Sequence, residues 1–84
     1  MSSIRWERRA VKEFRRLPKE LRAPVFEAVG ALRQDPLKGE PLGGRWKGLR
    51  RLRVAAIRAI YGFDGSELLI SVLRIGHRRE VCRK

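Results

Sequence analysis

The sequence contains one cysteine and one histidine among its 84 residues, and it has no long apolar segment. One cysteine cannot form an internal disulfide, and one cysteine with one histidine cannot supply the ligands of a structural zinc site. Its apolar runs are only a few residues long, whereas a membrane-spanning helix needs about 20 apolar residues. The N-terminus also lacks the apolar core of a signal peptide. The sequence therefore predicts a protein of the reducing cytoplasm, with no metal, no cofactor and no membrane segment.

Acidic residues are scarce as well. Nine Asp and Glu stand against 21 Lys and Arg, which gives a formal net charge of +12 and a sequence pI of about 11.5. A chain this short forms one domain, residues 1–84, which buries only about 60% of the surface of its unfolded chain and has little room for a deep cofactor cleft. A pI above about 9 with clustered basic residues is typical of nucleic-acid-binding domains. We therefore expect a polyanionic partner.

The positive charge is concentrated in the second half of the chain. Residues 45–84 hold 11 basic and 3 acidic side chains, whereas residues 1–44 hold 10 and 6. Arginine outnumbers lysine 16 to 5, and the planar guanidinium fork matches phosphate oxygens better than an ammonium group does. The second half is thus the part expected to meet the polyanion.

A short alternating segment around Trp6 predicts a first strand, which lies at a sheet edge or pairs with a later strand. The spacing of apolar residues after this segment is that of a helix. Pro18 should end the first helix, because the residue before a proline avoids helical geometry. Pro24 suits the first turn of the second helix, which would then start near Arg22 and stop at Asp35-Pro36. The apolar residues at helical spacing are Ala10, Val11, Phe14 and Leu17, then Leu21, Val25, Ala28, Val29 and Leu32.

Apolar and basic residues alternate in the second half, as in a sheet with one buried side. We expect strands over residues 50–54, 57–63 and 67–75, after a glycine-rich loop over residues 37–48. Asp64-Gly65 is a good turn between the last two strands, whereas Ala55-Ala56 is a weak one because alanine disfavours positive φ. The predicted fold class is α+β: a short N-terminal strand and a helical hairpin packed on one face of an antiparallel meander, whose other face stays open.

The chain resembles toxins of the RelE/ParE superfamily, the small basic components of bacterial and archaeal toxin–antitoxin pairs. The similarity covers the opening strand, the helix ending in Leu-Pro, the second helix ending in Leu-Arg-Gln-Asp-Pro, and the Pro-Leu-Gly-Gly loop. It continues through Leu-Arg-Arg-Leu-Arg-Val, Ile-Arg-Ala-Ile-Tyr and Leu-Arg-Ile-Gly-His-Arg-Arg-Glu-Val. The resemblance implies a RelE-like fold, a cognate RelB-like antitoxin as partner, and a toxin–antitoxin hetero-oligomer.

Resemblance to the RelE branch also implies a ribosome-dependent endoribonuclease that cuts mRNA in the A site without a metal ion, with ribosomal RNA and mRNA as partners. The catalytic positions of that branch fall on Arg51, with Arg53 beside it, then on Arg58, Arg78 and Cys82. At position 82 the family commonly has tyrosine, and Ala55-Ala56 replaces the usual Gly-Asp. A thiol cannot stack broadly on a base as a phenol ring does, and its reference pKa is about 8.5.

Cleavage of RNA by the ribose 2′-OH needs a proton acceptor, a proton donor and cations that stabilise the phosphoryl charge. Arginine stays charged near neutrality, so the four candidate arginines suit electrostatic stabilisation. His77 is the obvious proton carrier, with a reference pKa near 6.5, although a histidine at a strand end can equally just bond to the backbone. Cys82 and Tyr61 are further candidates, and a buried, hydrogen-bonded role suits Tyr61 better.

Other basic and aromatic residues form a candidate RNA-binding set. Trp46 can stack on an unpaired base or, equally, anchor the loop in the core. The cations of this set are Arg45, Lys47, Arg50, Arg53, Arg74, Arg79 and Arg83.

Two other functions remain open at this point. A ParE-like inhibitor of DNA gyrase would need no nuclease residues, and the joint presence of Arg51, Arg58 and Arg78 favours the nuclease over it. An inactive nucleic-acid-binding relative is suggested by Cys82 and by Ala55-Ala56.

Overall fold

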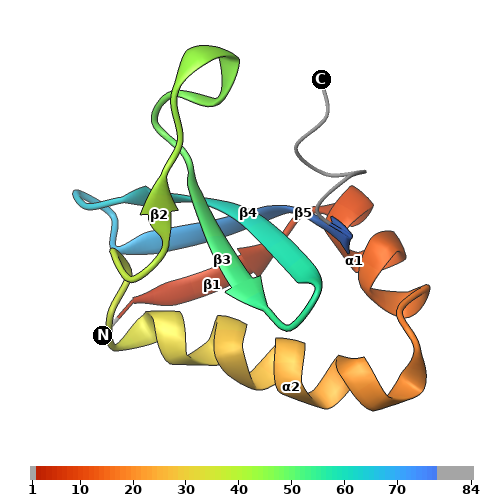
Figure 1. The fold of residues 1–84 in the computed structure, drawn as a ribbon. Coiled ribbons are helices and arrows are strands. Elements are labelled where there is room, and N and C mark those ends of the chain that lie inside the picture. Colours follow the sequence, from red (N-terminus) through yellow and green to blue (C-terminus); the bar gives the residue numbers. More distant parts are fainter. Residues whose placement is uncertain (1, 78–84) are drawn as a thin grey trace.

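The computed structural model describes residues 2–77, which form two layers, with helices on one face of a five-stranded sheet (Figure 1). The strand order in the sheet is β1-β5-β4-β3-β2. This arrangement confirms the predicted α+β fold. Its elements are β1 (Ser3–Trp6), α1 (Arg8–Arg15), α2 (Lys19–Gly30), the short 3-10 helix η1 (Ala31–Arg33), β2 (Glu40–Pro41), the 3-10 helix η2 (Gly44–Trp46), β3 (Arg50–Val54), β4 (Ile57–Asp64) and β5 (Leu69–His77).

The three C-terminal strands form the expected antiparallel meander, but the sheet as a whole is mixed. β1 lies at one edge and pairs in parallel with β5, from Ser3 opposite Leu69 to Trp6 opposite Val72. β2 pairs with β3 at the other edge, inside the segment predicted to be a loop. A strand of two residues is too short to show an alternating pattern in the sequence. Its proline is compatible with a strand only because β2 lies at the sheet edge. The loop prediction was therefore wrong for β2.

Both helices differ from expectation at their ends. α1 stops at Arg15, ahead of the Leu-Pro pair, and α2 begins at Lys19 instead of near Arg22. Pro18, in extended conformation, is the residue that caps α2, and the N–H of Leu21 donates to its carbonyl oxygen at 2.9 Å. Pro24 consequently lies inside the helix. The predicted start was wrong because Pro18 begins the second helix as well as ending the first.

The core lies between the helices and one face of the sheet. The cross-strand register places Leu52, Ala59 and Ile75 side by side on that face, and the helices cover them with buried aliphatic side chains. The cluster of buried residues there contains Ala10, Leu17, Val25, Val29, Leu32, Leu52, Ile57, Ala59, Tyr61, Ile70, Val72 and Ile75. Ile60, outside this cluster, is also fully buried. Since successive strand residues point to opposite faces, the strand residues between those of the cluster project from the other side.

Tyr61 belongs to this core and fastens the segment between η1 and β2 to it. Its hydroxyl donates to the carbonyl oxygen of Pro36 at 2.7 Å and accepts from the N–H of Gly39 at 2.9 Å. Burial raises the pKa of Tyr61. Arg50, its register partner, donates to the carbonyl oxygens of Leu37 and Gly39. The side chains of Tyr61 and Arg50 thus hold residues 36–39 against the helix-covered side of the sheet.

The two turns of the meander are held differently. Ala55 has a φ of +55° in a two-residue loop, a left-handed conformation that alanine adopts at a cost. Asp64 ends β4, and its Oδ1 accepts from the N–H and hydroxyl of Ser66 and from the N–H of Glu67. These bonds hold the pKa of Asp64 below its usual value, and they place the start of β5 at Leu69 instead of residue 67.

No helix within residues 2–77 combines the length and apolar character needed to cross a membrane.

Candidate nucleic-acid interface

Arginines from three neighbouring strands share the sheet face that the helices leave open. Arg53 of β3 lies opposite Arg58 of β4, and Arg58 lies opposite Gly76 of β5. Residues two apart in a strand share a face, so the next cross-strand row projects from the same side. That row contains Glu40, Arg51, Ile60 and Arg74. We call Arg51, Arg53 and Arg58 the arginine cluster. Arg53 and Arg58 are like charges placed directly opposite one another, an arrangement that destabilises a sheet.

Glu40 is the carboxylate beside the arginine cluster. Its Oε1 accepts from Nη2 of Arg51 at 2.5 Å, and the side chain remains 65% exposed. The hydrogen bond from Arg51 and its charge lower the pKa of Glu40, with further lowering by the charges of Arg53 and Arg58. The charges of all three arginines of the cluster therefore favour the ionised form of Glu40, which is a carboxylate at neutral pH. Sequence reasoning missed Glu40 because it lay in the segment taken for a loop.

Arg74 reaches this face because of a β-bulge. Tyr61 pairs with Val72, but the preceding residue, Ile60, pairs with Arg74, so Leu73 is an extra residue in β5. A bulge of this kind reverses the alternation beyond it and re-aims the side chains. Arg74 is thereby turned to the arginine face and Ile75 to the core.

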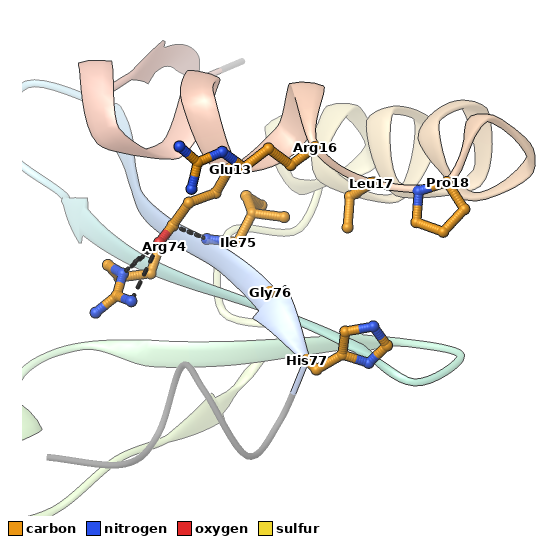
Figure 2. A pocket seen from close by; sticks show the side chains of 8 residues that line it. All are labelled: Glu13, Arg16, Leu17, Pro18, Arg74, Ile75, Gly76 and His77. Atoms are coloured by element: carbon orange, nitrogen blue, oxygen red, sulfur yellow. Dashed lines mark hydrogen bonds and ion pairs between the residues drawn. The ribbon is translucent and has the colours of Figure 1, made fainter.

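Glu13 of α1 holds Arg74 in place (Figure 2). The Nε and Nη2 atoms of Arg74 each lie 3.1 Å from Oε2 of Glu13, and Oε1 of Glu13 accepts from the N–H of Ile75 at 2.8 Å. Both charged side chains are only 18% exposed. Nothing in the sequence indicated this contact, because an acid on a basic helix is usually a solvated residue and its partner here lies 61 positions away.

The same bulge separates His77 from the arginine cluster. His77 lies opposite Ile57, a core residue, whereas Arg58 lies opposite Gly76. Figure 2 shows that His77 lines a hollow across from Leu17 and Pro18, and Arg74 and Glu13 line the same hollow at its other end. The structure therefore brings Arg51, Arg53 and Arg58 together and leaves the His77 side chain on the other side of the sheet.

The remaining sequence candidates fall into three groups. Arg45 and Trp46 lie in η2, and with Arg74 and Arg9 of α1 they line a hollow at the edge of the open face; Arg9 was not selected from the sequence. Lys47 is exposed at the end of η2, and Arg50 serves the helix side as described above. The last group, Arg78, Arg79, Cys82 and Arg83, lies outside the described residues.

Comparison with known proteins gives the family. A family model described as the ParE toxin of the type II toxin–antitoxin system parDE matches residues 4–82. The toxin RelG of Mycobacterium tuberculosis is 30% identical over 84 aligned positions, which cover 98% of this chain and 97% of RelG. The chain belongs to the RelE/ParE superfamily of type II toxins. It is thus the toxin component of a toxin–antitoxin system.

Solved structures of such toxins have the same fold. The RelBE2 toxin–antitoxin complex of Mycobacterium tuberculosis matches with a TM-score of 0.84 at 30% identity, over 92% of this chain and 98% of that chain. The RelE–RelB complex of Pyrococcus horikoshii OT3 matches with a TM-score of 0.80 at 23% identity, over 95% of this chain and 98% of that chain. The second likeness concerns the fold alone.

Proposed function

We propose that this toxin is a ribosome-dependent endoribonuclease that cleaves mRNA in the A site by attack of a ribose 2′-OH on the adjacent phosphate. The observation that carries the proposal is the arginine cluster: three guanidinium groups from β3 and β4 on the sheet face that the helices leave uncovered, where Arg53 is exposed and the side chain of Arg51 is 22% exposed. By the family resemblance, Arg51 and Arg58 correspond to catalytic positions of the RelE branch, and Arg53 lies beside Arg51.

In this proposal, Arg53 and Arg58 bind the scissile phosphate. Charge grows on its oxygens as the 2′-oxygen attacks, and preorganised cations lower the barrier by stabilising that charge. Arg51, oriented by its bond to Glu40, contributes a third cation. Arg78 adds a fourth by its match to the family motif.

Two proton transfers complete the reaction. Glu40 is our candidate for the acceptor of the 2′-OH proton because its carboxylate lies beside the arginine cluster and is bonded to Arg51, even though Arg51 lowers its pKa and so makes it a weaker base. Cys82 is our candidate for the donor to the leaving 5′-oxygen, since a thiol of ordinary pKa is protonated at neutral pH. His77 takes no part in these proton transfers, because the strand register places its side chain on the opposite side of the sheet from the arginine cluster.

We also propose that a RelB-like antitoxin holds the activity off in the cytoplasm, within a hetero-oligomer. The solved relatives from Mycobacterium tuberculosis and Pyrococcus horikoshii are toxin–antitoxin complexes. The whole chain has a formal net charge of +12. An acidic antitoxin segment would therefore be complementary in charge to its arginine-bearing open face.

The test is cleavage of mRNA on programmed ribosomes by the purified toxin. Arg58→Ala should slow cleavage by roughly 100- to 1,000-fold, the usual loss for one preorganised charge-stabilising group. Arg8→Ala, an exposed arginine at the start of α1, is the matched control and should cleave normally. Intact A-site mRNA with the folded wild-type chain would refute the proposal.

Glu40→Gln separates the two roles of Glu40. The amide can still accept from Arg51 but takes up no proton, so a proton acceptor at this position predicts a loss of roughly 100-fold or more. Cleavage within about threefold of wild type would mean that Glu40 only positions Arg51.

A second candidate function is inhibition of DNA gyrase, and the match to the ParE family model favours it. It predicts trapped gyrase–DNA complexes and no cleavage of mRNA, and it predicts that Arg58→Ala has little effect on toxicity.

A further inference from the structure

The hollow at the edge of the open face brings one aromatic ring together with three guanidinium groups. Arg9 comes from α1, Arg45 and Trp46 from η2, and Arg74 from β5. The loop that carries η2 stands beyond the sheet, between β2 and β3 (Figure 1). Folding is therefore needed to assemble this group, which no single stretch of sequence contains.

Trp46 has no place in the core. Among residues 2–77 it belongs neither to the buried cluster nor to the apolar residues packed against that cluster, yet it is partly exposed in the hollow. The other tryptophan, Trp6, does pack on the core and lies edge-on to Phe14, with ring centroids 5.3 Å apart. Of the two roles that the sequence allowed Trp46, the structure therefore supports a surface one.

The hollow is positively charged. Glu13 is shared between Arg74 and Arg9, whose Nε lies 3.5 Å from its Oε2. For Arg45, an exposed residue, the described part of the chain shows no ion pair. Two of the three cations thus share one carboxylate, and the indole beside them is partly exposed.

We infer that this hollow is a subsite for an unpaired nucleotide of the RNA, with the base stacked on Trp46 and the phosphate bound by Arg9 and Arg45. Stacking on an aromatic ring with cations along the backbone is how proteins bind single strands. An acidic protein segment would match the charge but would leave the indole without a partner ring. RNA is therefore the better occupant.

This inference rests on the proposed function and refines it. Arg74 is in the same cross-strand row as Arg51, separated from it by Ile60 of β4. Two strand spacings amount to roughly 10 Å. The subsite would therefore hold a nucleotide next to the cleaved one, and Trp46 would position the strand without touching the reacting atoms.

Fluorescence of Trp46 tests the subsite directly. The chain has two tryptophans, so the full-length Trp6→Phe variant leaves Trp46 as the sole indole. A short single-stranded oligoribonucleotide should quench it saturably, and an abasic strand of the same length should bind roughly 10-fold more weakly without quenching. Should Trp6→Phe not fold, the difference between wild type and Trp46→Phe gives the same reading.

Substitutions then identify the contacts. Trp46→Ala should weaken binding of the oligoribonucleotide roughly 10-fold, and Trp46→Phe should restore it to within about threefold. Arg9→Gln and Arg45→Gln should each reduce the slope of log affinity against log salt by about 0.7, as expected when one phosphate contact of a single strand is lost. The control, Arg8→Gln, should leave the slope unchanged.

Several results would overturn the subsite. Equal affinity of the abasic strand, or equal quenching by a polyglutamate peptide, would exclude a base stacked on Trp46. If the wild-type chain cleaves mRNA normally but shows no quenching, the subsite is refuted and the proposed nuclease activity stands. If the oligoribonucleotide quenches Trp46 but the chain cleaves no mRNA, the subsite is supported and the proposed nuclease activity is refuted.

Discussion

Glu13 is predicted to be the residue on which the C-terminal half of β5 depends. β1 pairs with β5 only as far as Val72. Beyond that point the outer edge of β5 has no strand partner among residues 2–77, and the carboxylate of Glu13 accepts the N–H of Ile75 while it pairs with Arg74. Replacing Glu13 therefore removes two kinds of interaction at once.

The expected loss can be worked out from these contacts. A buried N–H left without an acceptor costs about 1–3 kcal/mol. The ion pair, with both side chains 18% exposed, lies between a surface pair worth about 0–1 kcal/mol and a buried pair whose breakage costs about 3–5 kcal/mol. We expect Glu13→Ala to lower the free energy of unfolding by about 2–4 kcal/mol. Glu13→Gln keeps an acceptor for Ile75 and should lose about 1–2 kcal/mol.

Urea denaturation followed by circular dichroism measures both losses. A double-mutant cycle with Arg74→Ala should give a coupling energy of about 0.5–3 kcal/mol. Glu67→Gln, an exposed carboxylate in the turn before β5, should change stability by less than about 0.5 kcal/mol. If Glu13→Ala also costs less than about 0.5 kcal/mol, the reasoning about the edge of β5 is wrong.

Three further predictions concern stability, each measured by urea denaturation. Ala55→Gly should stabilise the toxin by about 0.5–1 kcal/mol by relieving the left-handed conformation, whereas Ala56→Gly should give no gain. Gly39→Ala should cost about 1–3 kcal/mol, because its Cβ would lie 2.8 Å from the ring of Tyr61; Gly43→Ala, with no atom within 4 Å, should be nearly neutral. Tyr61→Phe should cost about 1–3 kcal/mol through its two hydrogen bonds. Since burial raises the pKa of Tyr61, the unfolded state loses the tyrosine proton first, so wild-type stability should fall as the pH rises above about 10, and the phenylalanine variant should lack that part of the fall. The tyrosinate absorbance of this single tyrosine reports its titration.

Sequence patterns located the meander well and its surroundings less well. Strand 50–54 was predicted at its observed bounds, because alternating arginine and aliphatic residues give an unambiguous period of two. The two-residue β2 gave no such period, although it carries Glu40. The start of α2 was misplaced because Pro18 does two things at once, ending one helical segment and capping the next.

Pairing across long separations explains what was missed at the candidate site. Arg9 and Glu13 had the spacing of solvated helix residues, and only the fold brings them beside Arg74 and Trp46. The sequence identified the arginines as residue types suited to phosphate. Their grouping required knowledge of which strands are neighbours.

The bulge at Leu73 shows why the site depends on more than strand neighbours. Ile70 and Val72 are core residues, and strict alternation would place Arg74 on their side and His77 on the opposite side. One extra residue reverses both assignments, so that Arg74 joins the arginine face and His77 faces the helix side. The run Val72 to His77 contains no glycine or proline before position 76 that would mark the bulge. Register therefore decides whether histidine or arginine lies on the open face of the sheet, because a single inserted residue determines which side chain each face receives.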